Sequence, residues 1–334
     1  IKPHLSMQLF DAFVGSIISY ACPVWGFSKS KDLETIHLKF CKMILGVRLN
    51  SCNDAIYGEL GRYPLYINRY VQIIKYWFTV LNTDNIILTN VYKQAYAQYE
   101  KGVDNWVKKV KALLEQYGFF GIWSCPANVN VKSFIPIFKQ RLIDCFYQKW
   151  YSNIASTNVL NSLYVHTKAA VGYENYLDII VSKSLRQYLT RIRISSHSLR
   201  IQTGRYGKER IARNERTCQL CQANEIEDEY HFIFKCSLYD ELRVKYIIRY
   251  FRTNPSMFKL IELLSTDNKN ILIKLCTYIK VSTAKRNETL LIISKNNVSV
   301  LIQYECKHLP VYFAKNCIYM YPSFPKIQTF RKPW

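Results

Sequence analysis

Apolar residues recur at helical spacing through most of the first eighty positions, with polar residues between them. The helices that this pattern predicts cover residues 5–20, 33–45, about 51–61 and 65–81. Gly46 and Gly61 stand where the second and third patterns stop, which is the position where a helix often ends in a left-handed residue. Four short helices with brief connections predict a helical bundle over 1–81.

The pattern loosens after this bundle. Between 82 and 131 only residues 104–117 keep a clear helical stripe, and the rest is typical of a linker or hinge. A further amphipathic stripe runs from Phe138 to Trp150 and is most simply explained by packing. We therefore expect a helical connector over 82–182.

Towards the carboxyl end, apolar periods at 257–264 and 271–279 predict two closing helices, which we assign to 254–286. The remaining stretch, 287–334, contains apolar pieces broken by Asn and Lys and carries no functional signal. The patterns together predict a mainly α protein.

The most specific chemical signal is a group of four potential metal ligands. Cys218 and Cys221 are separated by two residues, so that one tight turn can direct both thiolates at a single ion. His231 and Cys236 follow a short loop, and three thiolates with one imidazole suit tetrahedral zinc. The alternative is a redox pair, or two buried thiols beside an unrelated histidine, and it leaves His231 and Cys236 without a role.

The surroundings favour a structural ion over a catalytic one. Protein fills all four positions, whereas a catalytic zinc keeps one position open for water. Ser237 and Asp240 have the spacing of a helix cap, and the apolar face that follows predicts a helix to about Arg252. We expect the zinc to hold a loop against the start of this helix.

Composition adds a charge signal. The chain has 46 Lys and Arg against 24 Asp and Glu, and a net charge of +22 favours a polyanionic partner, with nucleic acid first and an anionic membrane second. No apolar run reaches about 18 residues, so we expect a soluble protein without a membrane partner. Eleven cysteines without a disulfide framework favour a reducing compartment. Because the first Met, Met7, lies inside a predicted helix, we expect a piece of a longer product.

The strongest concentration of charge lies just before the proposed ligands, and we call residues 183–216 the basic arm. Its cations are Lys183, Arg186, Arg191, Arg193, Arg200, Arg205, Lys208, Arg210, Arg213 and Arg216. Arginine suits phosphate because its planar fork donates two parallel hydrogen bonds. Arg186, Arg193 and Arg200 are seven apart and would share a helix face, unless Ser195 and Ser196 break the helix.

The loop between the ligands is acidic. It carries Glu225, Glu227, Asp228 and Glu229, which repel phosphate, and we interpret Asp228-Glu229 as a solvated spacer. We therefore expect the basic arm, and not the metal loop, to contact a nucleic-acid strand.

Residues 189–243 carry a resemblance to a known family. The matching residues are His197, Leu199, Thr203, Gly204, Arg205, Arg216, Cys218, Cys221, the acidic run 227–229, His231, Phe232, Cys236 and Tyr239. This pattern resembles the zinc-binding tail of reverse transcriptases from animal non-LTR (LINE-like) retrotransposons. The loop before His231 is longer than in a retroviral zinc knuckle, so base binding of the knuckle type is not implied.

Three shorter runs, 19–26, 33–47 and 58–65, resemble the thumb that follows the polymerase palm in the same family. A thumb grips a duplex mainly by its backbone, and the resemblance thus implies phosphate contacts from Lys39, Lys42 and Arg48. Residues 140–150 are similar to the connector of these proteins.

The resemblance implies a thumb-like bundle (1–81), a connector (82–182) and a basic arm with a zinc-binding module (183–253). Such a region would hold template RNA and target DNA, in the cytoplasm and nucleus, for an upstream polymerase core of the same polyprotein. Polymerisation needs paired metal-binding carboxylates, usually Asp-Asp, and the chain contains no such dipeptide. The alternative is a stand-alone helical adaptor that uses its zinc module for protein contacts.

Overall fold

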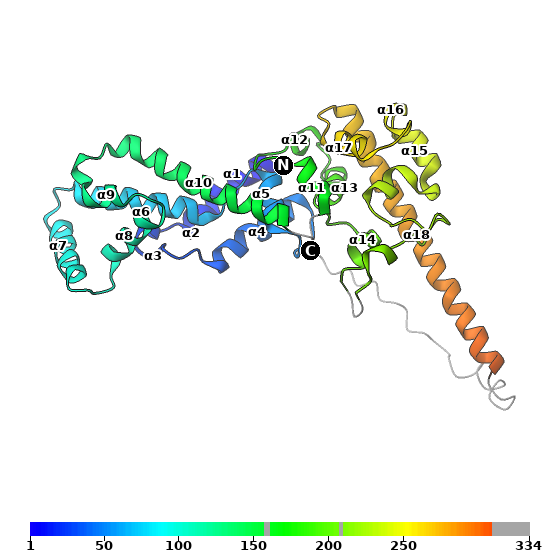
Figure 1. Ribbon diagram of the computed structural model, residues 1–334, viewed down its shortest axis with the longest axis horizontal. Coiled ribbons are helices and arrows are strands. Elements are labelled where there is room, and N and C mark those ends of the chain that lie inside the picture. The colour runs from blue at the N-terminus through cyan, green and yellow to red at the C-terminus, as the bar shows by residue number, and fades with distance from the viewer. Residues whose placement is uncertain (157–160, 207–209, 309–334) are drawn as a thin grey trace. The chain divides into compact units, whose positions relative to one another are not determined.

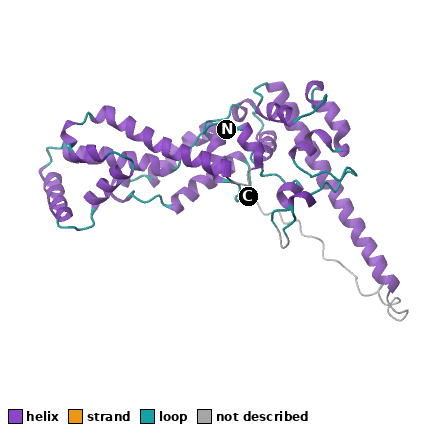
Figure 2. Ribbon diagram, in the orientation of Figure 1, coloured by secondary structure: helices purple, strands orange, loops and turns teal. Residues whose placement is uncertain are grey.

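The computed structural model describes residues 1–156, 161–206 and 210–308, which form helices joined by short connections (Figures 1 and 2). These ranges contain no β-strand, and the β-type pairs described in them are two isolated bridges. The mainly α class is therefore confirmed. The chain divides into two compact units, 1–280 and 281–334.

The predicted amino-terminal bundle contains all four expected helical stretches. Its elements are α1 (Pro3–Leu9), a π-helical turn η1 (Phe10–Gly15), α2 (Ser16–Ile18), α3 (Cys22–Trp25), α4 (Lys31–Leu45), α5 (Asn53–Leu60) and α6 (Leu65–Leu81). Gly46 and Gly61 follow α4 and α5 with φ of 67° and 60°, so both predicted stops are left-handed glycines.

The second group of helices is more regular than the sequence suggested. It comprises α7 (Ile86–Glu100), α8 (Trp106–Gln116), α9 (Phe120–Ser124), a 3-10 turn η2 (Pro126–Asn128) and α10 (Val131–Ser156). The loose pattern over 82–103 led us to expect a linker, but α7 forms there, begun by the Asn85 side chain accepting a hydrogen bond from the Leu88 N–H. None of its residues is buried, which explains why it shows no apolar stripe. Helix α10 packs along α6 (Figure 1).

The third group surrounds the proposed metal ligands. Its elements are α11 (Asn161–Thr167), α12 (Tyr176–Ile179), α13 (Lys183–Arg193), α14 (Arg200–Thr203), η3 (Arg213–Glu215), a π-helical turn η4 (His231–Lys235), η5 (Ser237–Tyr239), α15 (Asp240–Tyr246), α16 (Arg249–Arg252), α17 (Met257–Ser265) and α18 (Lys269–His308).

Two predictions change in this third group. The single helix expected from Ser237 to Arg252 is divided into η5, α15 and α16, because Ile247 and Ile248 adopt extended backbone angles. The closing helix expected at 271–279 is instead α18, which continues to His308. Residues 309–334 of the unassigned tail lie outside the described residues.

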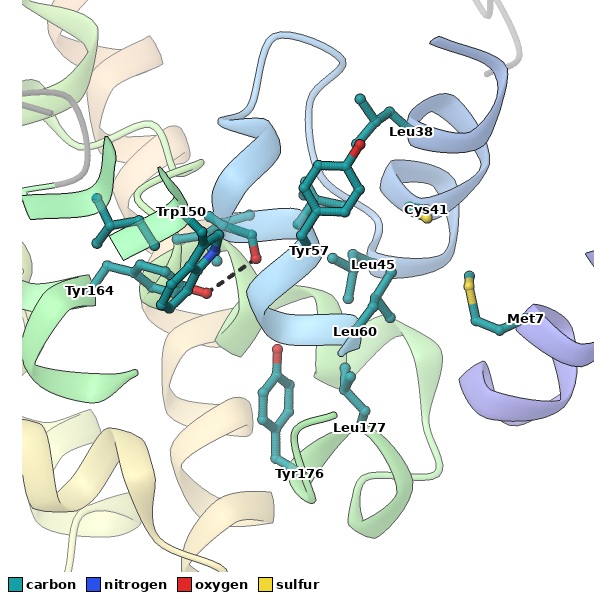
Figure 3. Packing of buried hydrophobic residues seen from close by; sticks show 14 of the residues in the cluster. Met7, Leu38, Cys41, Leu45, Tyr57, Leu60, Trp150, Tyr164, Tyr176 and Leu177 are labelled. Carbon is teal, nitrogen blue, oxygen red and sulfur yellow. Dashed lines mark hydrogen bonds between the residues drawn. The ribbon is translucent and has the colours of Figure 1, made fainter. Parts of the chain in front are cut away.

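Helix α5 lies at the centre of the core in the first unit, because residues 55–60 are all buried. The Trp150 Nε1–H donates to the carbonyl of Asp54 at 2.7 Å. The Tyr164 hydroxyl donates to the carbonyl of Ala55 at 3.1 Å (Figure 3). Gly58 permits this approach, since a Cβ there would lie 2.4 Å from the Tyr164 hydroxyl oxygen. The bundle is thus held to the helices that follow it by close contacts with one helix.

A buried charge network ties α5 to α13. The guanidinium of Arg193 donates to Glu59 at 3.1 and 3.2 Å and to Glu174 at 2.8 Å, and both Arg193 and Glu59 are completely buried. The Tyr176 hydroxyl also donates to Glu59 at 2.6 Å. Buried ions need such partners, because an unpaired charge in the interior is strongly destabilising.

Candidate metal centre and basic surface

The four predicted ligands come together in the structure. The sulfur atoms of Cys218, Cys221 and Cys236 and a ring nitrogen of His231 all lie within 4.8 Å of one another. Cys221 Sγ is 3.4 Å from His231 Nε2, and Cys218 Sγ is 3.9 Å from Cys236 Sγ. This group can hold a metal ion with four protein ligands, as the sequence predicted.

A short paired turn carries the first two ligands. The Cys218 N–H donates to the Glu225 carbonyl at 2.8 Å, and the Glu227 N–H donates to the Arg216 carbonyl at 2.9 Å. These bonds belong to an antiparallel bridge between Thr217 and Ile226. The chain therefore reverses within a few residues, and both thiols of the Cys-x-x-Cys run are brought to the same side.

The imidazole of His231 is oriented from two sides. The backbone N–H of His231 donates to the Asp228 carboxylate at 2.8 Å, which anchors the start of η4. Its Nδ1 lies 2.9 Å from Glu225 Oε2, so Nε2 is left to face Cys221. Metal-binding histidines commonly donate their second ring nitrogen to a carboxylate, which fixes the tautomer. The sequence showed Glu225 only as a repelling charge, and its position six residues before His231 does not reveal this contact.

Two of the thiols, those of Cys218 and Cys236, are close enough to hydrogen-bond to each other. The hydrogen bond with Cys236 lowers the pKa of Cys218 to about 3, and the same bond raises the pKa of Cys236. Metal ligation needs thiolates. Cys218 is therefore the thiol that loses its proton most easily, and a bound cation would also displace the protons of Cys221 and Cys236.

Of the Asp228-Glu229 pair that we expected to be solvated, Glu229 is buried. Glu227 and Glu229 are only 3% and 4% exposed. Glu229 Oε1 lies 2.7 Å from His197 Nε2, and Glu227 accepts a hydrogen bond from the Arg200 backbone N–H at 2.8 Å. The two carboxylates thus bind the basic arm to the metal loop, and neither presents its charge to solvent.

The structure separates the cations of the basic arm into two groups. Arg186 and Arg193 are buried, and Arg186 donates to the Ile180 carbonyl at 2.8 Å. The guanidinium groups of both residues are used inside the fold, which argues against the phosphate contact that we predicted for them. The shared helix face also fails, since α13 ends at Arg193 and Ser195 adopts a φ of 55°.

The other cations of the arm lie at or near the surface. Lys183, Arg210 and Arg213 are exposed, whereas Arg191, Arg200, Arg205 and Arg216 are half-buried. Lys208 lies outside the described residues.

Two of the half-buried arginines, Arg216 and Arg205, have different surroundings. Arg216 donates to the carbonyls of Ile201 and Ile211 at 2.8 to 3.0 Å and so holds the arm together. Burial lowers the pKa of Arg205, and the positive charges of Arg216 and Arg213 lower it further. Arg216 also donates its backbone N–H to the Arg213 carbonyl at 3.3 Å, and its side chain lies against Gly204, the residue before Arg205.

The three cations expected to contact phosphate from the thumb-like bundle differ in their exposure to solvent. Lys39 and Arg48 are exposed and remain candidates for phosphate contact. Lys42 is buried, its ammonium donates to the Leu49 carbonyl at 2.8 Å, and burial lowers its pKa. Lys42 closes the turn after α4, which argues against the phosphate contact that we predicted for it.

Among the described residues, the search for a bilayer-crossing helix finds none that is both long and apolar enough. Comparison of the chain with protein-family models, with curated proteins and with solved structures finds no match. The family resemblance therefore rests on the motif residues themselves.

Proposed function

We propose that this chain is the nucleic-acid-binding C-terminal region of a non-LTR retrotransposon reverse transcriptase. In this role it positions template RNA and target DNA for an upstream polymerase core of the same polyprotein, in the cytoplasm and nucleus. The observation that carries the proposal is the contact between separate parts of the resembling motif. His197 of the His-x-Leu part meets Glu229 of the Glu-Asp-Glu part at 2.7 Å, with both side chains buried.

A second contact supports the same proposal. Arg216, directly before the Thr-Cys run, donates to the Ile201 carbonyl at 3.0 Å, and its side chain lies against Gly204 of the Thr-Gly-Arg part. The motif residues therefore behave as one folding unit and not as scattered matches. A unit of this kind would present the basic arm in a fixed form to a strand.

Zinc is the metal that we propose for the four-residue group. Three sulfur ligands and one nitrogen suit zinc in tetrahedral geometry, and no ligand position is left for substrate water. The ion would hold the turn at 217–226 against η4, and its role would be structural.

Salt-dependent binding of single-stranded RNA and DNA tests the proposal. The binding of a labelled oligonucleotide is followed by fluorescence anisotropy over a range of salt concentrations. Each phosphate contact steepens the fall of log affinity with log salt by about 0.7 for a single strand. Charge reversal of Arg200, Arg210 and Arg213 to Glu should thus flatten the slope by about two units.

A matched control reverses three exposed cations of the α7–α8 region, Lys93, Lys101 and Lys109, and changes the net charge equally. The proposal expects a much smaller change of slope in this control. Equal slopes for the wild type and both triple variants would refute the assignment of binding to the basic arm.

One observation favours the adaptor alternative. Apolar side chains of the amino-terminal helices are strongly exposed, with Phe13 at 69%, Ile17 at 74% and Tyr20 at 81%. Contiguous exposed apolar surface often marks a protein contact. An adaptor needs no salt-dependent affinity for nucleic acid, so the same anisotropy experiment separates the two functions.

Primer extension tests the relation to a polymerase core. With magnesium and an RNA template, this chain alone should incorporate no nucleotide, since the Asp-Asp pair that usually holds the two metal ions is missing from its sequence. Adding the chain to a palm-containing fragment should increase incorporation. Activity of the chain alone would contradict the proposal, and the absence of any gain on mixing would favour the adaptor.

A further inference from the structure

A small polar hollow lies between the turn after α4 and the segment that follows α13. Residues 48–52 form one side of it, and residues 194–206 contribute the other. Its volume is about 30 Å³. A water molecule needs roughly 10–15 Å³ on this measure, so the hollow has room for two or three water-sized atoms.

Hydrogen bonds fix the walls of this hollow. Ser196 Oγ accepts from the Arg48 backbone N–H at 3.3 Å and lies 2.8 Å from Ser51 Oγ. His197 is held by Glu229 at 2.7 Å, and the Leu199 N–H donates to its Nδ1 at 3.3 Å. These wall groups are already paired with protein, and the shape of the hollow is set before any ligand arrives.

Gln202 differs from the other wall residues. Its side chain is 97% buried, at 3% exposure, and its Nε2 has no hydrogen-bond partner within the described ranges. A buried donor without a partner is destabilising, because it has lost its hydrogen bond to water. Such a group at the wall of a hollow is satisfied when an acceptor enters.

The rim of the hollow is positive and aromatic. The side chain of Arg48 is exposed there, and Tyr206 is 57% exposed on the other side. Arg191 lies nearby, because its Nε–H donates to the carbonyl of Gly46, two residues before Arg48, at 2.8 Å. A ligand that joins an anion to a planar ring matches this site, because the anion can bind the Arg48 cation and the Gln202 donor while the ring stacks on Tyr206.

We infer that this hollow receives the non-bridging oxygens of one backbone phosphate of a single-stranded nucleic acid. Gln202 Nε2 and the Arg48 guanidinium donate to the non-bridging phosphate oxygens, and the adjoining base stacks on Tyr206. This inference rests on the proposed function, to which it adds a defined contact point. It also gives the thumb-like bundle and the basic arm a shared role, because each supplies one side of the hollow.

The test combines binding with stability. Gln202→Met keeps the volume of the side chain and removes the donor, so the variant should be as stable as the wild type or more stable, while its affinity for a labelled single-stranded 12-mer falls about tenfold. Tyr206→Ala should also lose about tenfold, the loss expected when one base no longer stacks. Arg141→Gln, an exposed arginine on α10, should bind as the wild type does.

Photocrosslinking locates the contact independently of these variants. RNA containing 4-thiouridine, irradiated on the wild-type protein, should crosslink to the peptide that contains Tyr206. Inorganic phosphate alone should compete with the oligonucleotide only weakly, because it lacks a base.

Two patterns of results would overturn the inference. If the wild type binds RNA with a steep salt dependence, but Gln202→Met and Tyr206→Ala bind equally well and no crosslink reaches Tyr206, the hollow is not the contact and the proposed function stands. If the wild type binds no oligonucleotide at any salt concentration, both the inference and the proposed function fail.

Discussion

Replacing Arg193 with Met should be the most destabilising change of charge in the first unit. The guanidinium makes two hydrogen bonds to Glu59, one to Glu174 and one to the Leu264 carbonyl at 2.7 Å. Burial alone would lower the pKa of Arg193, but the negative charges of Glu59 and Glu174 outweigh it and raise the pKa above its ordinary value. The native state therefore depends on this cation at every pH at which the protein folds.

The magnitude follows from what Arg193→Met leaves behind. Glu59, completely buried, would keep only the hydrogen bond from Tyr176 and would have no balancing charge. Breaking a buried pair in this way costs about 3–5 kcal/mol. For a unit of this size the melting temperature should fall by roughly 10 °C.

Urea denaturation followed by circular dichroism measures the effect. Arg213→Met serves as the control, because this arginine is exposed and its loss should change stability by no more than about 0.5 kcal/mol. The double variant Arg193→Met, Glu59→Leu should be more stable than Arg193→Met alone, since no unpaired charge remains. Two results would refute the reasoning. One is a decrease in the free energy of unfolding of less than about 1 kcal/mol for Arg193→Met. The other is a double variant whose decrease equals the sum of the decreases for Arg193→Met and Glu59→Leu.

Three further predictions concern the ligands, the core and pH. Cys221→Ser should abolish the protease resistance of residues 216–243 and spare the amino-terminal helices, because structural zinc contributes roughly 10–16 kcal/mol in small modules; limited proteolysis with mass spectrometry checks this. Gly58→Ala should lower stability by at least about 2 kcal/mol in thermal melts, since its Cβ would meet the Tyr164 hydroxyl. Burial would raise the pKa of Glu34, yet hydrogen bonds, the largest from His37, lower it. The ionised Glu34 carboxylate therefore stabilises the fold above the unfolded pKa of about 4.3, and this stabilisation is lost as the pH falls through the lower folded pKa. Glu34→Gln should flatten the plot of unfolding free energy against pH in this range.

The features that the sequence predicted correctly are determined by neighbouring residues. Gly46 and Gly61 end their helices because a left-handed backbone favours glycine, and this requirement is visible in the sequence. The Cys-x-x-Cys spacing predicts a tight turn, and the turn at 217–226 is the result. Local chemistry therefore predicted both the bundle and the four-ligand group.

The features that the sequence did not predict depend on distant partners. Arg193 is 134 residues from Glu59 along the chain, so a count of local charges placed it on the surface. Glu229 was interpreted as solvated for the same reason, because its partner His197 lies 32 residues away. A charged residue gives the same local pattern whether it meets water or a buried counter-charge.

Helix α7 was missed for a different reason. Apolar periodicity detects helices that bury one face, and no residue of α7 is buried. The Asn85 cap, whose side chain accepts from the Leu88 N–H at 3.0 Å, was the available signal for its start.

X-ray absorption spectroscopy at the zinc edge tests the central claim, a zinc ion that organises the basic module through four protein ligands. On purified protein we expect one zinc per chain, with three sulfur ligands at about 2.3 Å and one nitrogen ligand at about 2.0 Å. Substitution of Cys236 by Ser should remove one sulfur from this shell. Protein that carries no zinc, or zinc surrounded by oxygen ligands only, would contradict the account.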